Sequence, residues 1–211
     1  MLRVSEIFYS LQGESKTVGQ PTVFVRLTGC PLRCVWCDTE YAFNGGSKWS
    51  LEEILEQVRG YGARYVCVTG GEPLAQPTCI SLLEALVEEG YEVSLETSGA
   101  IDLAQVPIKV TKVMDLKPPG SGELKANRFE NIQYLNIGDQ VKFVLQDRAD
   151  YEWAKLQVAN YSLGHRAEIL FSPVAGKMDP VALANWILED RLRVRFQIQL
   201  HKYLWGNQHG V

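Results

Sequence analysis

Three cysteines lie within eight positions of the stretch GCPLRCVWCDTEY, at Cys30, Cys34 and Cys37. Thiolates at this C-x3-C-x2-C spacing can bind metal, but a closed structural zinc site needs four ligands, and no fourth cysteine or histidine is near. A 4Fe–4S cluster is normally held by four thiolates. Three thiolates on such a cluster would leave one iron free to bind another molecule, and this is the interpretation we favour.

Two other interpretations of the cysteines stay open. Cys34 and Cys37 alone form a C-x-x-C that could act as a thiol redox pair, and the three thiolates could share a structural zinc site across a dimer. The remaining two cysteines, Cys67 and Cys79, stand in apolar runs and are predicted to be small buried hydrophobic residues.

Polar groups and glycines end most of the predicted strands. They occur in TGC, TGGEP, ETSG, DLKPP, FSP and QLHK. Sites in α/β proteins form where the carboxyl ends of parallel strands meet. We therefore expect these groups to converge on the edge that carries the cysteine loop.

Strand-like and helical patterns alternate along the chain and predict the elements that position these groups. Short apolar runs predict strands at 22–27, 64–71, 91–99, 109–119, 140–147, 168–173 and 195–205. Helical spacing predicts helices at 50–62, 79–90, 148–161 and 179–192. Ser50 and Glu53 form a capping box, and Gly90 suits a helix end. The alternation predicts an α/β fold with a mainly parallel sheet, and no linker divides residues 1–211, so we expect one domain.

The composition excludes some classes of function. The chain has 211 residues and a formal charge of -4, without a long basic run, which argues against nucleic-acid binding. No apolar run approaches the roughly 20 residues that span a bilayer. The N-terminal stretch lacks the layout of a signal peptide. We expect a cytoplasmic protein that does not enter membranes.

The cysteine motif and the later GGEP, residues 70–73, together resemble the radical S-adenosylmethionine (SAM) superfamily. In that superfamily SAM chelates the open iron, and one electron from the reduced cluster cleaves it to a 5′-deoxyadenosyl radical. The stretches SLQGE, FVRLTGC, CDT, ETSG and QLHK narrow the resemblance to the 7-carboxy-7-deazaguanine synthase family, over about residues 5–202.

This resemblance implies a modified partial (β/α) barrel, similar to a TIM barrel, in a homodimer. It implies a lyase that converts 6-carboxy-5,6,7,8-tetrahydropterin to 7-carboxy-7-deazaguanine with loss of ammonia, on the route to queuosine and related 7-deazapurines. The implied cofactors are a 4Fe–4S cluster, SAM and Mg²⁺. The electron donor would be a protein such as a flavodoxin or a ferredoxin.

The family's functional residues carry over to matching positions. The cluster ligands would be Cys30, Cys34 and Cys37. SAM would contact Gly70, Gly71, Glu72, Glu96, Ser98, Lys117 and Ser172. The pterin would face Gln12, Glu14, Arg26 and His201, with the Arg26 fork suited to its carboxylate and Glu14 suited to the donor edge of its ring. Thr39 would be the protein ligand of Mg²⁺.

Two alternatives come from other classes. A glycyl-radical activating enzyme shares the cysteine spacing but does not explain QGE or QLHK. A non-catalytic iron–sulfur electron carrier normally completes its cluster with a fourth cysteine.

Overall fold

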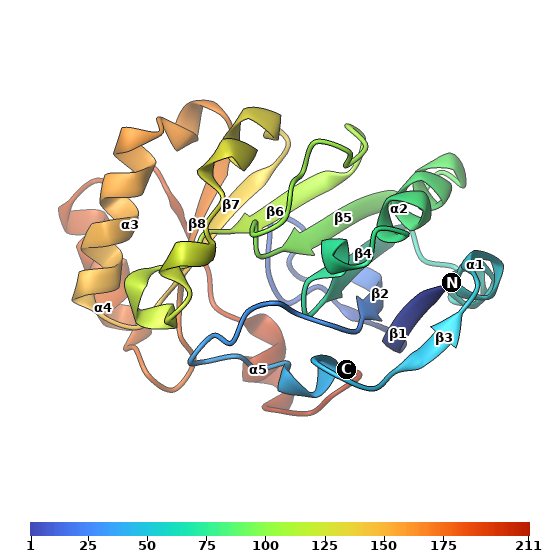
Figure 1. Cartoon of the computed structure of the whole chain (residues 1–211). Helices are drawn as coiled ribbons and strands as arrows, with labels where there is room; N and C mark the ends of the chain where they lie inside the picture. Colours follow the sequence, from blue (N-terminus) through green and yellow to red (C-terminus); the bar gives the residue numbers. More distant parts are fainter.

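Nine strands form one sheet in the computed structural model, which describes residues 1–211 (Figure 1). The strands are β1 (Leu2–Leu11), β2 (Pro21–Leu27), β3 (Ser47–Trp49), β4 (Tyr65–Gly70), β5 (Glu92–Thr97), β6 (Thr111–Asp115), β7 (Gln140–Leu145), β8 (Glu168–Pro173) and β9 (Arg195–Phe196). Their order is β3-β1-β2-β4-β5-β6-β7-β8-β9, so the edge strands β3 and β9 do not pair and the sheet stays open. Every pair from β2 to β9 is parallel, whereas β1 runs antiparallel to both β2 and β3.

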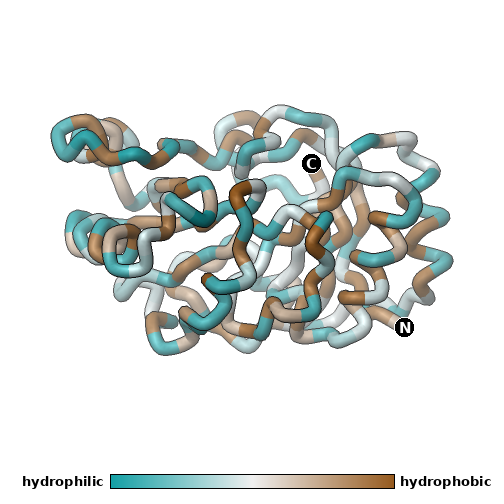
Figure 2. Tube along the Cα trace, turned by 90° about the horizontal axis from the view of Figure 1, so that it is seen from above, coloured by the Kyte–Doolittle hydropathy of each residue, from teal (hydrophilic) through white to brown (hydrophobic).

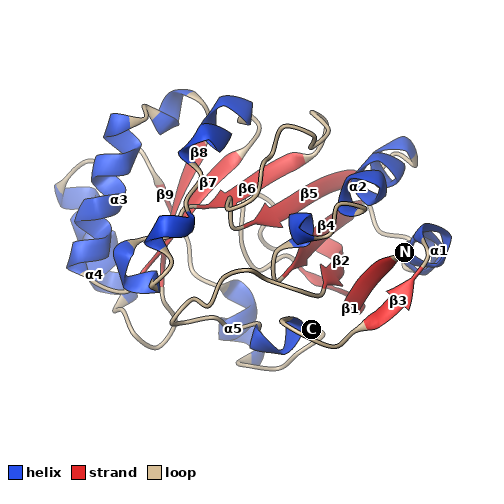
Figure 3. Cartoon of the chain, viewed as in Figure 1, coloured by secondary structure: helices blue, strands red, loops and turns tan.

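Helices fill several of the connections between strands (Figure 3). They are α1 (Leu51–Gly60), α2 (Cys79–Glu88), α3 (Arg148–Asn160), α4 (Pro180–Glu189) and α5 (Leu200–Trp205). Ser50 caps α1 in a complete capping box with Glu53. Gly90 follows α2 with a φ of +86°, a conformation that glycine adopts at little cost. No helix is long and apolar enough to cross a membrane.

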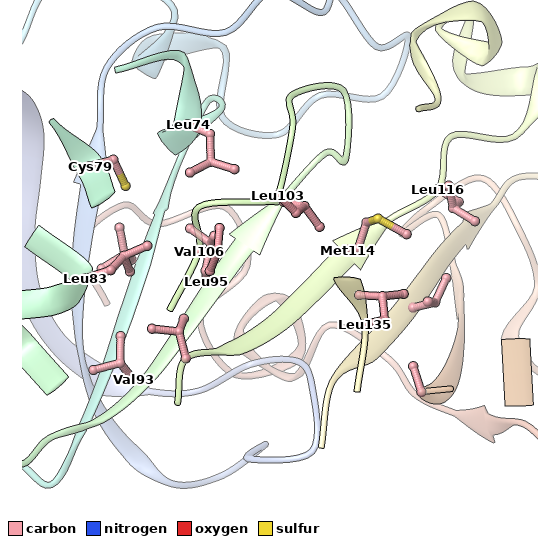
Figure 4. Close-up of a cluster of buried hydrophobic side chains, with 14 of the residues drawn as sticks. Leu74, Cys79, Leu83, Val93, Leu95, Leu103, Val106, Met114, Leu116 and Leu135 are labelled. Atoms are coloured by element: carbon pink, nitrogen blue, oxygen red, sulfur yellow. The ribbon is translucent and has the colours of Figure 1, made fainter. Parts of the chain in front are cut away.

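The hydrophobic core lies between one face of the sheet and helices α1 to α4. Leu83 of α2, Val93 and Leu95 of β5 and Met114 of β6 belong to one buried hydrophobic cluster (Figure 4). Alternate residues of each strand point to opposite faces. Apolar and polar stretches follow one another along the whole trace (Figure 2). We call the face that turns away from α1 to α4 the inner face.

The inner face is unusually polar for a buried surface. β7 contributes Val141, Phe143 and Leu145 to the core, which directs the alternate residue Lys142 to the inner face. By the same alternation, Glu96 of β5 and Asp115 of β6 lie on this face, beside core residues of their strands. A polar inner surface of an open sheet is suited to binding a polar ligand.

Most of the predicted elements are present, but one prediction is wrong. Residues 195–205, expected to be one strand, form the two-residue strand β9 followed by helix α5. Only one edge of β9 is paired, with β8, and the chain then leaves the sheet so that Leu200 N donates to the Gly13 carbonyl at 2.9 Å. Tertiary contacts thus override an apolar pattern that suited a strand.

Candidate active site

The loop that follows β2 carries the three clustered cysteines, all half-buried and none in a disulfide. Two backbone contacts hold this loop. Gly29 N, just before Cys30, donates to Ala42 O at 2.8 Å, and Val35 N, between Cys34 and Cys37, donates to Ser121 O at 3.0 Å. Burial raises the pKa of the Cys34 thiol to about 11, and the nearby Asp115 and the other two thiols act in the same direction. Positive iron would favour the thiolate form that ligation needs.

The donor set fits a four-iron cluster better than a single ion. A zinc ion requires all of its sulfur ligands at about 2.3 Å, yet no group of three His, Cys, Asp or Glu side chains in the chain is close enough to hold one metal ion. A cluster places each thiolate on a different iron and so accepts a wider arrangement.

The glycine-rich loop after β4 packs directly on the cysteine loop. A Cβ added to Gly71 would lie 2.4 Å from the carbonyl oxygen of Gly29 and 2.6 Å from the Cβ of Cys30. Gly71 N also donates to Leu27 O at 3.2 Å. Contact between the two motifs therefore requires glycine at position 71.

Glu72 is completely buried, and its carboxylate accepts hydrogen bonds from the protein. The donors are Ser98 N at 2.7 Å, Ser98 Oγ at 2.5 Å, Thr97 Oγ1 at 3.0 Å and Leu74 N at 3.1 Å. Glu72 therefore fastens the end of β4 to the end of β5. Its predicted contact with SAM stays a prediction, since both carboxylate oxygens have protein partners here.

A charged cluster occupies the inner face beside these loops. Lys142 Nζ lies 2.5 Å from Glu14 Oε2, 3.4 Å from Glu96 Oε2 and 4.0 Å from Asp115 Oδ2. Asp115 also pairs with Lys117 Nζ at 2.9 Å. Glu14 belongs to the β1–β2 hairpin loop, so residues from four segments of the chain meet at one point.

The two glutamates of this cluster have opposite electrostatic surroundings. Burial would raise the pKa of Glu14, but the Lys142 ammonium outweighs it, and the pKa lies below its ordinary value. Burial raises the pKa of Glu96, and the more distant Lys142 offsets this only in part. Environments that separate the pKa values of two carboxyls are typical of active sites.

Lys117 connects the charged cluster to the cysteine loop. Burial would lower its pKa, yet Asp115 and then Cys34 raise it above the ordinary value. Lys117 in turn lowers the pKa of Cys34, so the predicted SAM-contacting residue and the predicted cluster ligand interact electrostatically.

Four buried polar atoms near this cluster have no hydrogen-bond partner. They are Gln12 Nε2, Glu96 Oε1, Asp115 Oδ1 and Ser172 Oγ. Nearly all buried polar atoms in native proteins are paired, so each exception needs an explanation. A polar ligand on the inner face would supply the missing partners, and the residues present therefore fit SAM and a polar substrate.

Helix α5 brings His201 to the hairpin loop that carries Gln12 and Glu14. A Cβ on Gly13 would lie 2.1 Å from His201 Nδ1, so only glycine leaves room for the imidazole here. Gln199, just before α5, donates from Nε2 to Glu14 Oε1 at 2.7 Å and to Asp38 Oδ2 at 3.2 Å. The start of the helix thus joins the β1–β2 hairpin loop to the end of the cysteine loop, beside which α5 lies in Figure 1.

The predicted magnesium ligand lies at this junction. Thr39 Oγ1 donates to Asp38 Oδ1 at 2.9 Å, and Lys202 Nζ of α5 pairs with Asp38 Oδ2 at 2.7 Å. Hard cations prefer such oxygen ligands.

Arg26, a predicted substrate-binding residue, is paired with an acidic side chain of β1. Its Nε donates to Glu6 Oε1 at 2.7 Å, and Tyr41 OH donates to the same oxygen at 2.7 Å. No hydrogen bond uses the two terminal guanidinium nitrogens, which leaves them able to bind a carboxylate.

Sequence reasoning missed several residues of the charged cluster and its surroundings. They are Asp38, Thr97, Asp115, Lys142, Gln199 and Lys202. Lys142 carried a signal, because a lysine in the middle of the apolar run QVKFVLQD must be paired if that run is a buried strand.

Residues 24–113 match the radical SAM superfamily. The 7-carboxy-7-deazaguanine synthase of Koribacter versatilis is 45% identical, covering 97% of each chain, and that of Chlorobaculum tepidum is 44% identical, covering 97% of this chain and 94% of the relative. The crystal structure of QueE from Escherichia coli superposes with a TM-score of 0.77 at 22% identity, over 95% of this chain and 94% of that one. The crystal structure of Streptococcus suis SuiB bound to S-adenosylmethionine superposes with a TM-score of 0.57 at 16% identity, over 80% of this chain and 44% of that one.

These matches define a radical SAM protein with a partial TIM-like barrel. At such identity along almost its full length, the chain belongs to the 7-carboxy-7-deazaguanine synthase family. The resemblance, the fold class and the assignment as an enzyme are therefore confirmed. Family membership implies a 4Fe–4S cluster and SAM as cofactors.

Proposed function

We propose that this chain converts 6-carboxy-5,6,7,8-tetrahydropterin into 7-carboxy-7-deazaguanine with loss of ammonia, on the route to queuosine. One observation carries the proposal beyond family membership. Unpartnered polar atoms of Gln12 and Glu96 lie buried near the Glu14–Lys142 pair, on a face joined to the cysteine loop through Lys117.

The cysteine side of the site would bind the cofactors. Cys30, Cys34 and Cys37 would hold the cluster, which when bound and reduced supplies the electron that cleaves SAM to a 5′-deoxyadenosyl radical. Gly70, Gly71 and Glu72 would form the loop that receives the methionine end of SAM. Glu96, Ser98, Lys117 and Ser172 would complete this subsite. Ser172 Oγ is buried and unpartnered, so it has a hydrogen bond to offer.

The hairpin side would bind the pterin. Glu14 and Gln12 would bind the polar edge of the pyrimidinone ring, because a carboxylate accepts from N–H groups and an amide can both donate and accept. Arg26 would bind the substrate carboxylate through its free terminal nitrogens. His201 would cover the substrate from α5.

Several finer features belong to the same proposal. Thr39 would ligate Mg²⁺ beside the Asp38–Lys202 pair, with water or substrate oxygens as further ligands. Residues 1–211 would act as one radical SAM domain in a cytoplasmic homodimer. A flavodoxin or ferredoxin would deliver the electron.

An anaerobic assay tests the proposal. Reconstituted protein receives reductant, SAM, Mg²⁺ and the tetrahydropterin, and mass spectrometry follows 7-carboxy-7-deazaguanine and 5′-deoxyadenosine. Formation of the deazaguanine is expected. Deoxyadenosine without deazaguanine would refute the substrate assignment and keep the radical chemistry. Neither product from cluster-loaded protein would refute both.

A further inference from the structure

Lys142 is a buried cation on the inner face, with its side chain 10% exposed. Burying an ammonium group costs a large free energy unless the charge is paired. The protein therefore keeps this lysine inside its sheet only because carboxylates surround it. The residues on either side of it in β7, Val141 and Phe143, are apolar and cannot pair with its charge.

Two of these carboxylates have no other cation. Within 4.0 Å, Glu14 pairs only with Lys142, and so does Glu96. Asp115 differs, because Lys117 neutralises it at 2.9 Å while Lys142 is 4.0 Å away. One ammonium group thus serves two acidic side chains that come from the hairpin loop and from β5.

Other charged groups face the pair but do not replace Lys142. Glu14 senses His201 of α5 and Asp38 of the cysteine loop, and Glu96 senses Glu14 and Asp115. Cys67 of β4 lies near Glu96 as a thiol whose pKa burial raises to about 12. His201 supplies little positive charge to Glu14, since burial lowers the pKa of its imidazole. Removal of Lys142 would leave two neighbouring carboxylates to share a proton.

We propose that Lys142 is a positioning residue, which holds Glu14 as an ionised hydrogen-bond acceptor for the N–H groups of the substrate's aminopyrimidinone ring. The inference rests on the proposed function. A protonated carboxyl would present a donor to a donor and weaken binding. Lys142 thereby sets the affinity for the pterin.

The test measures the binding of 6-carboxypterin, an unreactive aromatic analogue, to the SAM-loaded holoenzyme by fluorescence quenching. Lys142→Met should raise its Kd about 10- to 100-fold near pH 7, the loss expected for hydrogen bonds to charged groups. The ratio of variant to wild-type Kd should fall as the pH rises from about 6 to about 8, because the shared proton leaves. Taking the ratio cancels the ionisation of the pterin itself.

Lys112→Met is the matched control. Lys112 is 2% exposed and pairs with Asp139 at 3.0 Å on the opposite face of the sheet. This variant should lose stability, yet it should keep the wild-type Kd and its pH profile. Lys142→Arg, which retains the charge, should recover much of the affinity. A merely structural role for Lys142 would give both methionine variants the same phenotype.

If Lys142→Met does not fold, Lys142→Met/Glu96→Gln is compared with Glu96→Gln alone. A higher Kd in the double variant supports the proposal, because Glu14 has then lost its cation. Equal Kd values overturn it, as does a wild-type Kd and pH profile in Lys142→Met. A wild type that cleaves SAM but binds no pterin and forms no deazaguanine would refute the proposed function, and this inference with it.

Discussion

The backbone amide of Glu72 donates to the carbonyl of Gly29 at 2.8 Å, which joins the glycine-rich loop to the residue before the first cluster cysteine. Two motifs that are about forty residues apart in the sequence therefore form one structural unit. Gly71 packs against the same carbonyl. The cysteine loop can therefore keep this position only because residue 71 has no side chain.

Gly71→Ala should disturb this unit. The added Cβ would meet a backbone oxygen at 2.4 Å, which only a shift of one loop can relieve, at a cost of about 1–3 kcal/mol. We expect reduced iron content after reconstitution, measured by iron and sulfide analysis, and little 5′-deoxyadenosine. Gly60→Ala at the end of α1 meets nothing within 4 Å and should behave as wild type. Full iron content in Gly71→Ala would contradict the packing argument.

Cys34→Ala should abolish the cluster and SAM cleavage together, because two thiolates remain for a cluster that needs three protein ligands. Cys79→Ala is the control, because Cys79 is a cysteine of α2 that belongs to the hydrophobic core. It should cost some stability by leaving a cavity and keep both the visible absorbance of the cluster and the release of 5′-deoxyadenosine. Cleavage of SAM by Cys34→Ala would refute the assignment of three thiolate ligands.

Local signals in the sequence predicted much of the fold. The Ser50–Glu53 capping box and the glycine after α2 are properties of adjacent residues, and the structure has both. Parallel strands such as β4 and β8 are buried on both faces and therefore give continuous apolar runs. The parallel arrangement also predicted that the groups at the strand ends meet at one rim, because the carboxyl ends of parallel strands lie at one edge of the sheet.

Other features depend on partners that are distant in sequence. β1 is antiparallel to β2 and β3, an edge arrangement that alternation of strands and helices does not predict. Glu14 and Lys142 are 128 positions apart, so their pairing exists only in the folded chain. The same holds for the pairing of Glu6 with Arg26, the residue expected to bind the substrate carboxylate.

Asp139→Ala should destabilise the fold strongly. Its carboxylate pairs with the buried Lys112 at 3.0 Å and accepts from two backbone amides at 2.8 Å. Loss of one partner leaves an uncompensated buried charge, which costs about 3–5 kcal/mol. Urea denaturation should report a loss of this size. The double variant Asp139→Ala/Lys112→Met should regain part of it, and an Asp139→Ala effect near zero would contradict the pairing.

His201 should make folding stability depend on pH. Burial lowers the pKa of His201 below its ordinary value, although Glu14 and Asp38 oppose this. The unfolded chain therefore takes up the proton at a higher pH than the native one, so stability is lost as the pH falls below about 6.5. We expect the difference in Tm between wild type and His201→Gln to fall from about pH 7 to about pH 5. The exposed His165→Gln should give no such trend, and a rising difference would show that the folded state favours the charged imidazole.

Arg26→Lys separates substrate binding from internal pairing. Lysine keeps the charge for Glu6 but lacks the planar fork that binds a carboxylate through two N–H groups. If the free guanidinium nitrogens bind the pterin carboxylate, Arg26→Lys should raise KM about 10- to 100-fold, with 5′-deoxyadenosine release in the absence of pterin unchanged. Glu6→Gln should have a much smaller effect, because it leaves the fork intact. Arg64→Lys is the control for the substitution itself, because Arg64 forms an exposed pair with Glu92. Equal effects of Arg26→Lys and Glu6→Gln on KM would mean that Arg26 acts through Glu6 alone.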